Sequence, residues 1–193
     1  MKLLNDSNLT SFNISDPDLI HKQIVPMIPF VEKASNISIP NVLLLAIDTT
    51  SYVNFRRNFN RTHKFIKQNN FYELRGYNKV GQNTFPNMIP YLTGYKPEEL
   101  VSIDKLREIF FDDWPLIWKK YSEKGFITTF LEEMPLYGLF HYELKGFKNE
   151  PTNYFLRPFH REIYNEKYNR FCYVEKTELE VKISLYVNWL NVN

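Results

Sequence analysis

The sequence NVLLLAID occupies residues 41–48 and GQNTFPNMIPYLTG occupies residues 81–94, and these two stretches decide the fold that we expect. The first is an apolar run of strand length that ends in an acid, as in a parallel strand covered on both faces. The second places Thr84 as the N-cap of a helix and Gly94 as its C-cap. In an α/β protein, strand ends and helix N-termini face the crevice where ligands bind. We therefore expect Asp48 and Thr84 to lie close together at one edge of a sheet.

Apolar and amphipathic patterns predict the other elements of the chain. The expected strands cover residues 42–47, 71–77 and 126–131, and the expected helices cover residues 53–68, 84–94, 100–111 and 114–123. Residues 179–190 fit both an alternating strand and one face of a helix. The alternation of strands and helices indicates an α/β fold with a mostly parallel sheet between helices. Residues 1–40 are punctuated by Asn, Ser and Pro and predict a loose leader or linker, so the expected domain covers residues 41–193.

Composition bounds the class of protein. A chain of 193 residues with 44% hydrophobic and 17% aromatic residues can bury a core, and it is too apolar to be disordered. The balance of 24 basic against 22 acidic residues, without runs of like charge, argues against nucleic-acid binding. No apolar run reaches 18 residues, so we expect no transmembrane span.

The single cysteine, Cys172, cannot form an internal disulfide. It is either a buried thiol or the partner of a cysteine elsewhere. Asn-x-Ser/Thr sequons begin at Asn5, Asn8, Asn13, Asn36 and Asn60, as in a glycosylated extracellular protein, although such sequons also arise by chance. Residues 1–4 begin like a signal peptide that polar residues then interrupt, so we expect no intact export signal in the sequence as written.

Several ordered motifs carry a resemblance to a known family. The TFPN run at residues 84–87, followed by the LTG turn at 92–94, resembles the nucleophile segment of the nucleotide pyrophosphatase/phosphodiesterases. Those enzymes belong to the alkaline phosphatase superfamily, which includes the sulfatases. Together with GYNKVG at 76–81, PLIW at 115–118 and NYFLRPF at 153–159, the pattern is similar to the DUF229 family of secreted, sulfatase-like animal proteins.

This resemblance implies an alkaline-phosphatase-like core and a metal-dependent hydrolase acting on a phosphate or sulfate ester. It places Asp48 at the position of the first metal-ligating aspartate, with zinc as the expected ion. It places Thr84 at the position of the nucleophile, which needs a base or a metal to activate it. Asn87 could orient the substrate, a small anionic ester or glycan. From the residues alone, Asp48 could instead be a loop residue, and Thr84 and Asn87 could be helix caps.

The resemblance also implies that this chain holds only part of the active site. The superfamily takes further aspartates and histidines from its C-terminal half, including an Asp-His pair, and this chain has no Asp-His dipeptide. We therefore expect the chain as written to be an inactive fragment, or a degenerate relative, of an extracellular hydrolase. The alternative is a non-catalytic secreted glycoprotein that uses the fold as a binding surface, with the aromatic residues of 140–159 as its surface or simply as core.

A lysine, two glutamates and the four histidines have both a functional and a structural interpretation. Lys79 could neutralise an anionic substrate or be a solvated lysine. Glu132 and Glu133 close a predicted strand and could serve acid–base chemistry, although a solvated strand end is more common. We expect each of the four histidines to be structural or solvated: His21, His63, His141 and His160.

Overall fold

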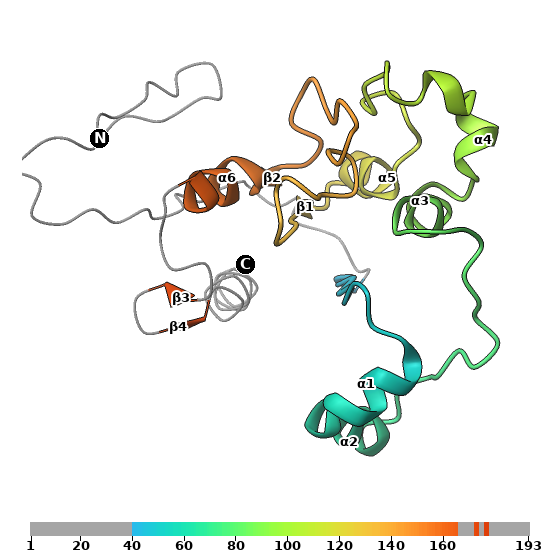
Figure 1. Cartoon of the computed structure of the whole chain (residues 1–193), viewed down its shortest axis with the longest axis vertical. Helices are drawn as coiled ribbons and strands as arrows, with labels where there is room; N and C mark the ends of the chain where they lie inside the picture. The colour runs from blue at the N-terminus through green and yellow to red at the C-terminus, as the bar shows by residue number, and fades with distance from the viewer. Residues whose placement is uncertain (1–39, 166–171, 174–175, 178–193) are drawn as a thin grey trace, which may run out of the picture.

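The computed structural model describes residues 40–165, 172–173 and 176–177 (Figure 1). In chain order these residues form α1 (Tyr52–Asn58), α2 (Asn60–Gln68), α3 (Phe85–Thr93), α4 (Pro97–Leu100), the 3-10 turn η2 (Ile103–Lys105), α5 (Ile117–Glu123), β1 (Thr129–Phe130), β2 (Tyr154–Phe155), α6 (Arg157–Asn165), β3 (Cys172–Tyr173) and β4 (Lys176–Thr177). The described part of the chain therefore contains short helices and very short strands joined by long irregular segments. The predicted leader at residues 1–40 and the ambiguous tail at 179–190 lie almost wholly outside the described residues.

The helix that the sequence predicts over residues 53–68 is two helices, α1 and α2. Phe59 separates them with φ −107° and ψ 47°, which is not helical. The rings of Phe55 and Phe59, four residues apart, stack with centroids 5.3 Å apart on one half-buried face, as neighbours on a continuous helix also would. His63 is half-buried beside these rings, whereas Thr62 is exposed.

Helix α3 begins and ends where the sequence predicts. Thr84 is its N-cap residue, and Gly94 ends it with φ +82°, a left-handed conformation that glycine adopts without steric cost. The inner face of the helix is buried through Ile89 and Leu92. This fixed packing makes α3 the element that positions Thr84.

The core of the described region is an aromatic cluster beneath α3 and α5. Phe111 and Phe140 are completely buried, and their ring centroids lie 5.0 Å apart. Phe85, the first residue of α3, lies 5.8 Å from Phe111 and 6.1 Å from Trp114 between ring centroids. Aromatic pairs at such distances add stability beyond the area that they bury. The start of α3 is thus anchored in the core.

A parallel pair of strands closes the other side of this core. β1 pairs with β2 in the register Thr129 to Tyr154 and Phe130 to Phe155. Asn153 reinforces the entry to β2, because its Oδ1 accepts hydrogen bonds of 2.9 Å from both the backbone N–H and the hydroxyl of Thr128. β3 and β4 form a separate antiparallel pair. The prediction of a strand within residues 126–131 is confirmed, although the strand is shorter than expected.

The strand predicted over residues 42–47 is absent. This stretch contains no assigned strand, and its apolar side chains are exposed, from 47% for Ile47 to 71% for Leu45. An apolar run becomes a strand only when a neighbour pairs with its backbone, and the described residues place no strand beside it. The expectation that a sheet edge presents Asp48 is therefore wrong for the described part of the chain.

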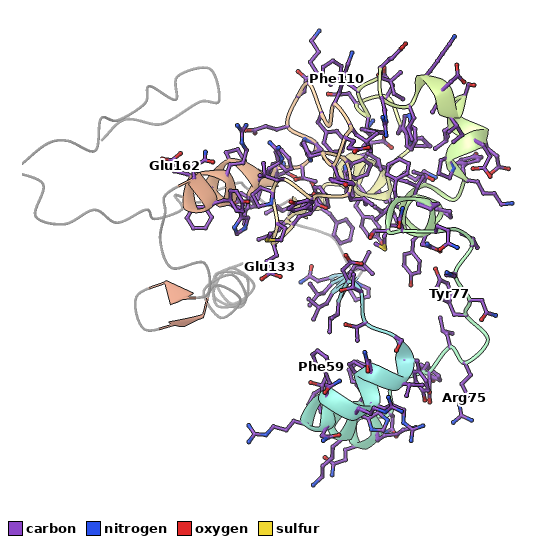
Figure 2. All side chains as sticks on the ribbon, viewed as in Figure 1. Phe59, Arg75, Tyr77, Phe110, Glu133 and Glu162 are labelled. Atoms are coloured by element: carbon purple, nitrogen blue, oxygen red, sulfur yellow. The ribbon has the colours of Figure 1, made fainter. Side chains whose placement is uncertain are left out.

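Two other expected elements differ from the structure. Residues 71–77 form no strand and lie exposed on the segment between α2 and α3, where Figure 2 shows Arg75 and Tyr77. The helix expected over residues 100–111 is replaced by the end of α4, the turn η2 and an irregular segment. In contrast, the helix expected up to residue 123 is present as α5, and Gly125 follows it with φ +82°. The sequence pattern thus predicted the helices that end just before a glycine. It failed for elements whose formation depends on strand pairing or on packing against other segments.

The aromatic residues of 140–159 are mostly core. Phe140 is fully buried, Tyr154 is 6% exposed, and Phe147 packs against the core cluster, whereas Tyr142 is exposed. Core packing therefore accounts for most of this aromatic content. A binding surface built from these residues is not supported.

Candidate functional site

The candidate site begins at Asp48, at the end of the exposed apolar run. Thr49 follows with φ +51°, and the hydroxyl of Thr50 donates a 3.1 Å hydrogen bond to the backbone oxygen of Asp48. Ser51 then caps α1 by accepting a 3.2 Å hydrogen bond from the backbone N–H of Asn54. These contacts form a tight turn that leaves the Asp48 carboxylate exposed.

Thr84 occupies the N-cap position of α3 without acting as a cap. Its backbone is helical, with φ −74° and ψ −45°, and its side chain makes no capping hydrogen bond. An N-cap oxygen normally accepts from the N–H of the second or third helical residue. The second residue here is Pro86, which has no N–H, and the N–H of Asn87 donates to the backbone oxygen of Thr84 at 3.1 Å. The hydroxyl is thus left available for another partner.

That partner is Asp48. The Thr84 hydroxyl donates a hydrogen bond to Asp48 Oδ1 at 3.2 Å, across 36 residues of sequence. Both side chains are exposed. The structure therefore brings together the two residues that the sequence paired, even though the strand expected to carry Asp48 is absent.

Asn87 lies one turn into α3 and faces the segment that precedes the helix. Its Oδ1 accepts from the N–H groups of Val80 at 2.7 Å and Gly81 at 3.3 Å. Its Nδ2 donates to the backbone oxygens of Gly81 at 2.9 Å and Asn83 at 2.6 Å. The predicted substrate-binding residue is thus engaged with the main chain on both sides of its amide.

Lys79, the cation expected near the site, is exposed and donates to Gln82 Oε1 at 3.2 Å. This contact is local, three residues along the chain, and it leaves the ammonium group in solvent. This geometry agrees with the interpretation of Lys79 as a solvated lysine.

The donor set suits a metal only in part. Asp48 offers carboxylate oxygens and Thr84 a hydroxyl oxygen, both of which are ligands for hard or borderline divalent ions. Among residues 40–165, 172–173 and 176–177, no group of three or more His, Cys, Asp or Glu side chains could hold a metal ion. The two residues therefore fit one corner of a metal site, and further ligands would have to come from outside the described residues.

Glu132 is a perturbed acid outside this site. Burial raises the pKa of its carboxyl to about 7, although a hydrogen bond from the Leu139 N–H and the charge of Arg157 both oppose the rise. Gly138 lies so close that a Cβ there would come within 2.5 Å of Glu132 Oε2. Glu133, its neighbour in sequence, is exposed, as Figure 2 shows. The sequence drew attention to both acids, but only the fold separates the buried one from the exposed one.

His141 and His160 are packed within the fold. Burial lowers the pKa of His141 to about 4, and the charges of Arg157 and Arg161 lower it further. Its ring stacks on Phe155 with centroids 6.1 Å apart. His160 is 1% exposed. The structural interpretation of these two histidines agrees with this packing.

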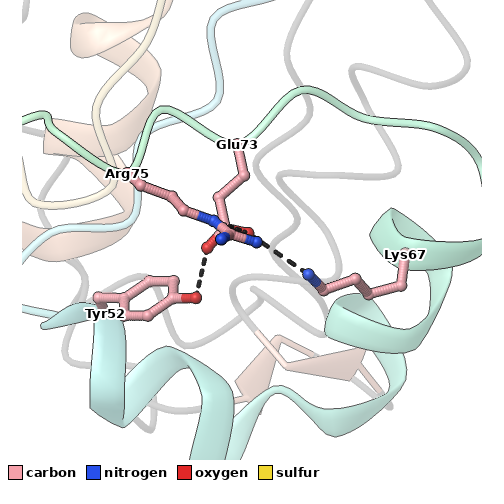
Figure 3. Close-up of polar contacts among 4 residues, drawn as sticks. All are labelled: Tyr52, Lys67, Glu73 and Arg75. Carbon is pink, nitrogen blue, oxygen red and sulfur yellow. Dashed lines mark hydrogen bonds and ion pairs between the residues drawn. The ribbon is translucent and has the colours of Figure 1, made fainter.

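A cluster that sequence reasoning missed lies on α1, α2 and the segment after them. Figure 3 shows the Glu73 carboxylate accepting from the Tyr52 hydroxyl and pairing with Lys67 and Arg75, each at 3.4 Å. The Tyr52 hydrogen bond lowers the pKa of Glu73 to about 2, and the two cations contribute in the same direction. This cluster ties the segment at residues 73–75 to the helical pair. No local pattern marks it, because Tyr52 and Glu73 are 21 residues apart.

The comparison with protein families identifies the chain. The model of the family described as "Protein of unknown function (DUF229)" matches residues 7–186. The chain belongs to the DUF229 family. The match includes Asp48, Thr84 and Asn87, and it also includes most of the stretch that we expected to be a leader or linker. No curated protein and no solved structure matches the chain.

Membership of DUF229 confirms the family that the motifs indicated. The relation to sulfatases and phosphodiesterases stays a prediction. In the part of the chain that the structure describes, no helix has the length and apolar character needed to cross a membrane.

Proposed function

We propose that this DUF229 chain contributes the nucleophile and one metal ligand to an extracellular, metal-dependent phosphate- or sulfate-ester hydrolase. The observation that carries the proposal is the 3.2 Å hydrogen bond between the Thr84 hydroxyl and Asp48 Oδ1. Two polar side chains 36 residues apart meet at an exposed position, where they support no core packing. A hydroxyl within hydrogen-bond reach of a carboxylate is one arrangement in which a base or a shared metal ion can activate a nucleophile.

The contact gives each residue a distinct role. Thr84 would be the nucleophile, because its side chain makes no capping hydrogen bond and Phe85, the next residue, is anchored in the core. Asp48 would orient the hydroxyl by accepting a hydrogen bond from it. The lone pairs of the Thr84 oxygen then point away from Asp48 and are available to a substrate. A positioned pair of this kind removes much of the entropic cost of bringing reactants together.

A divalent ion, with zinc as the expected one, would bind to the Asp48 carboxylate and the Thr84 oxygen. When bound, such an ion lowers the pKa of a ligated hydroxyl and stabilises negative charge that develops on a transferred group. Asp48 would supply its carboxylate ligand, and the oxygen of the nucleophile Thr84 would be a second ligand. The remaining ligands would come from outside the described residues.

The proposed step is a displacement at phosphorus or sulfur. The Thr84 oxygen forms a bond to that atom, the bond to the ester oxygen of the leaving group breaks, and the hydroxyl proton passes to water. The leaving alkoxide takes a proton from water. A second displacement by water then breaks the bond to the Thr84 oxygen and restores the Thr84 hydroxyl, releasing sulfate, phosphate or, from a diester, a phosphate monoester.

Zinc binding and turnover test this proposal together. The experiment uses the 193-residue chain and the product of the longest transcript that contains it. Calorimetric titration with Zn²⁺ should show that Asp48→Ala weakens binding by about tenfold or more, and that Thr84→Ala weakens it less. In a protein that hydrolyses a nitrophenyl phosphodiester or a nitrophenyl sulfate, Thr84→Ala should lower kcat by about a thousandfold or more.

Asp113→Ala is the matched control, because Asp113 is also an exposed aspartate in the described region. It should alter neither zinc affinity nor turnover. A zinc-dependent activity that is indifferent to Thr84→Ala would refute the nucleophile assignment. Zinc affinity that Asp48→Ala and Asp113→Ala change equally would refute the metal-ligand assignment.

A second candidate function has its own supporting observation. The chain exposes apolar side chains in two segments, one before α1 and one after α2, including Leu45 at 71%, Tyr72 at 99% and Leu74 at 72%. Exposed apolar patches commonly mark interaction surfaces. A non-catalytic secreted binding protein would therefore use this region rather than the aromatic residues of 140–159. Loss of partner binding on Leu74→Lys, with ester hydrolysis absent throughout, would favour this alternative.

A further inference from the structure

We propose that Asn87 is a positioning residue for Thr84: its side-chain amide locks the main chain of residues 80–83 and so holds the Thr84 hydroxyl over Asp48. The proposal rests on the proposed function for its chemical meaning, because a positioned hydroxyl matters only if it reacts. The lock itself is a property of this chain and can be tested without any catalytic assay. It replaces the expectation that Asn87 contacts substrate.

The lock consists of four hydrogen bonds from one side chain to the main chain of the turn. The carbonyl oxygen accepts from Val80 and Gly81, and the amide nitrogen donates to Gly81 and Asn83, at distances between 2.6 and 3.3 Å. A carboxamide can accept two hydrogen bonds and donate two. The amide is therefore saturated by the backbone, and no donor or acceptor is left over for a substrate.

The same contacts fix which way the amide points. Two N–H groups face the oxygen and two carbonyl groups face the nitrogen, so a flipped amide would oppose like groups at every contact. The first carbonyl oxygen that accepts a hydrogen bond within the helix is that of Thr84. The Asn83 carbonyl precedes it and accepts no such bond. The Asn87 side chain thus satisfies a backbone oxygen that the helix does not reach.

Two other features show that the turn is tightly specified. Asn83 has φ +66°, a left-handed conformation that asparagine tolerates better than most residues. Gly81 lies against the ring of Pro86, and a Cβ at position 81 would approach the Pro86 Cβ at 2.7 Å and Cγ at 2.8 Å. The turn is therefore folded back onto the first turn of α3, where Asn87 holds it.

Thr84 sits between two fixed points. On one side Phe85 packs in the aromatic core, 5.8 Å from Phe111 between ring centroids. On the other side the oxygen of Asn83, the residue before Thr84, accepts the 2.6 Å bond from Asn87. With the backbone held on both sides, the hydroxyl has few positions open to it, and the one that it occupies reaches Asp48 Oδ1.

Nuclear magnetic resonance of the full 193-residue chain tests the lock and its consequence separately. Asn87→Ala should raise the exchange rates of the Val80 and Gly81 amide protons by about tenfold, the effect of losing one hydrogen bond. Asn87→Asp keeps an acceptor for both N–H groups but sets its second oxygen against the Gly81 and Asn83 carbonyl oxygens, so it should preserve only part of their protection. Asn78→Ala is the matched control, because Asn78 makes a single side-chain bond of 3.2 Å, to the Gly76 oxygen.

The consequence is measured through the response of the Thr84 methyl signal to Asp48→Asn. In the otherwise unchanged chain this substitution should shift the signal, and in the Asn87→Ala background the shift should shrink to a small fraction. Unchanged signals of the Ile89 and Leu92 methyl groups serve as the check that α3 remains packed.

Each outcome decides the matter. Unchanged exchange at Val80 and Gly81 in Asn87→Ala would overturn the lock. Faster exchange with an undiminished response of Thr84 to Asp48→Asn would overturn the positioning role. Titration with Mn²⁺ supplies a separate arm: if the ion fails to broaden the Asp48 and Thr84 signals in the unchanged chain, the proposed metal site fails while the lock stands on its exchange data.

Discussion

Replacing Glu132 by glutamine removes a carboxyl group that folding makes harder to ionise. Burial is the largest influence on this carboxyl and raises its pKa from the ordinary value of 4.5 to about 7. Glutamine keeps an oxygen that can accept the hydrogen bond from the Leu139 N–H. The substitution therefore changes charge with little change in shape. It isolates the free energy that the buried carboxylate costs the fold.

The sign follows from proton binding. Between pH 4.5 and about 7, the folded chain holds a proton on Glu132 that the unfolded chain has released. The contribution of Glu132 to stability is therefore fully present below pH 4.5 and is lost as the pH rises through about 7. At 1.36 kcal/mol per pH unit, the interval corresponds to about 3 kcal/mol.

His141 acts in the opposite direction over an overlapping interval. Burial lowers its pKa from 6.5 to about 4, so its contribution to stability is present above pH 6.5 and is lost as the pH falls through about 4. The stability of the unchanged chain thus reflects both groups between pH 4.5 and 6.5. Only the difference between the chain and its Glu132→Gln variant reports on Glu132.

Urea unfolding at several pH values from 4 to 8.5 measures this difference, provided that unfolding is two-state. Relative to Glu132→Gln, the unchanged chain should lose about 3 kcal/mol of unfolding free energy between pH 4.5 and 8, as an upper limit set by the interval above. Glu133→Gln, at an exposed neighbouring position, is the matched control. Parallel pH profiles for the unchanged chain and Glu132→Gln would refute the assignment of a buried, protonated carboxyl.

Two further predictions concern the turn and the surface. Gly81→Ala should lower the unfolding free energy by about 1–3 kcal/mol, because its Cβ would meet the rigid Pro86 ring at 2.7 Å; an unaltered urea midpoint would contradict this. Asn60 begins an Asn-x-Thr sequon and is exposed at the start of α2, so we expect a glycan there when the chain is exported with a secretory leader from animal cells. Glycosidase treatment should then convert Asn60 to aspartate, which mass spectrometry detects, whereas an unmodified Asn60 peptide from the secreted protein would contradict the expectation.

The sequence predicted those parts of the fold that short-range chemistry determines. Helix α3 ends at Gly94 as expected, because a left-handed C-cap is a local property of glycine. The sequence also predicted that Asp48 and Thr84 would meet, on the basis of family resemblance and strand order. The contact is present, but the strand that was its premise is absent from residues 42–47.

The failures share a physical cause, which is dependence on distant partners. An apolar run such as residues 42–47 reads as a buried strand, yet strand formation requires a second chain segment for its backbone hydrogen bonds. The acids at positions 132 and 133 are alike in sequence, and only the fold makes Glu132 half-buried and leaves Glu133 exposed.

The diversion of Thr84 from capping to the candidate site could have been found in the sequence. A threonine before a helix is ordinarily a cap because its oxygen can accept from the N–H of the second or third helical residue. Pro86 at the second position removes one of these donors. The other donor, the N–H of the third helical residue Asn87, bonds to the Thr84 backbone oxygen. The Asn87 side chain meanwhile holds the preceding turn. Proline two residues after Thr84, and asparagine three residues after it, together free the hydroxyl and fix its backbone, so the spacing itself favours a hydroxyl with a partner outside the helix over a cap.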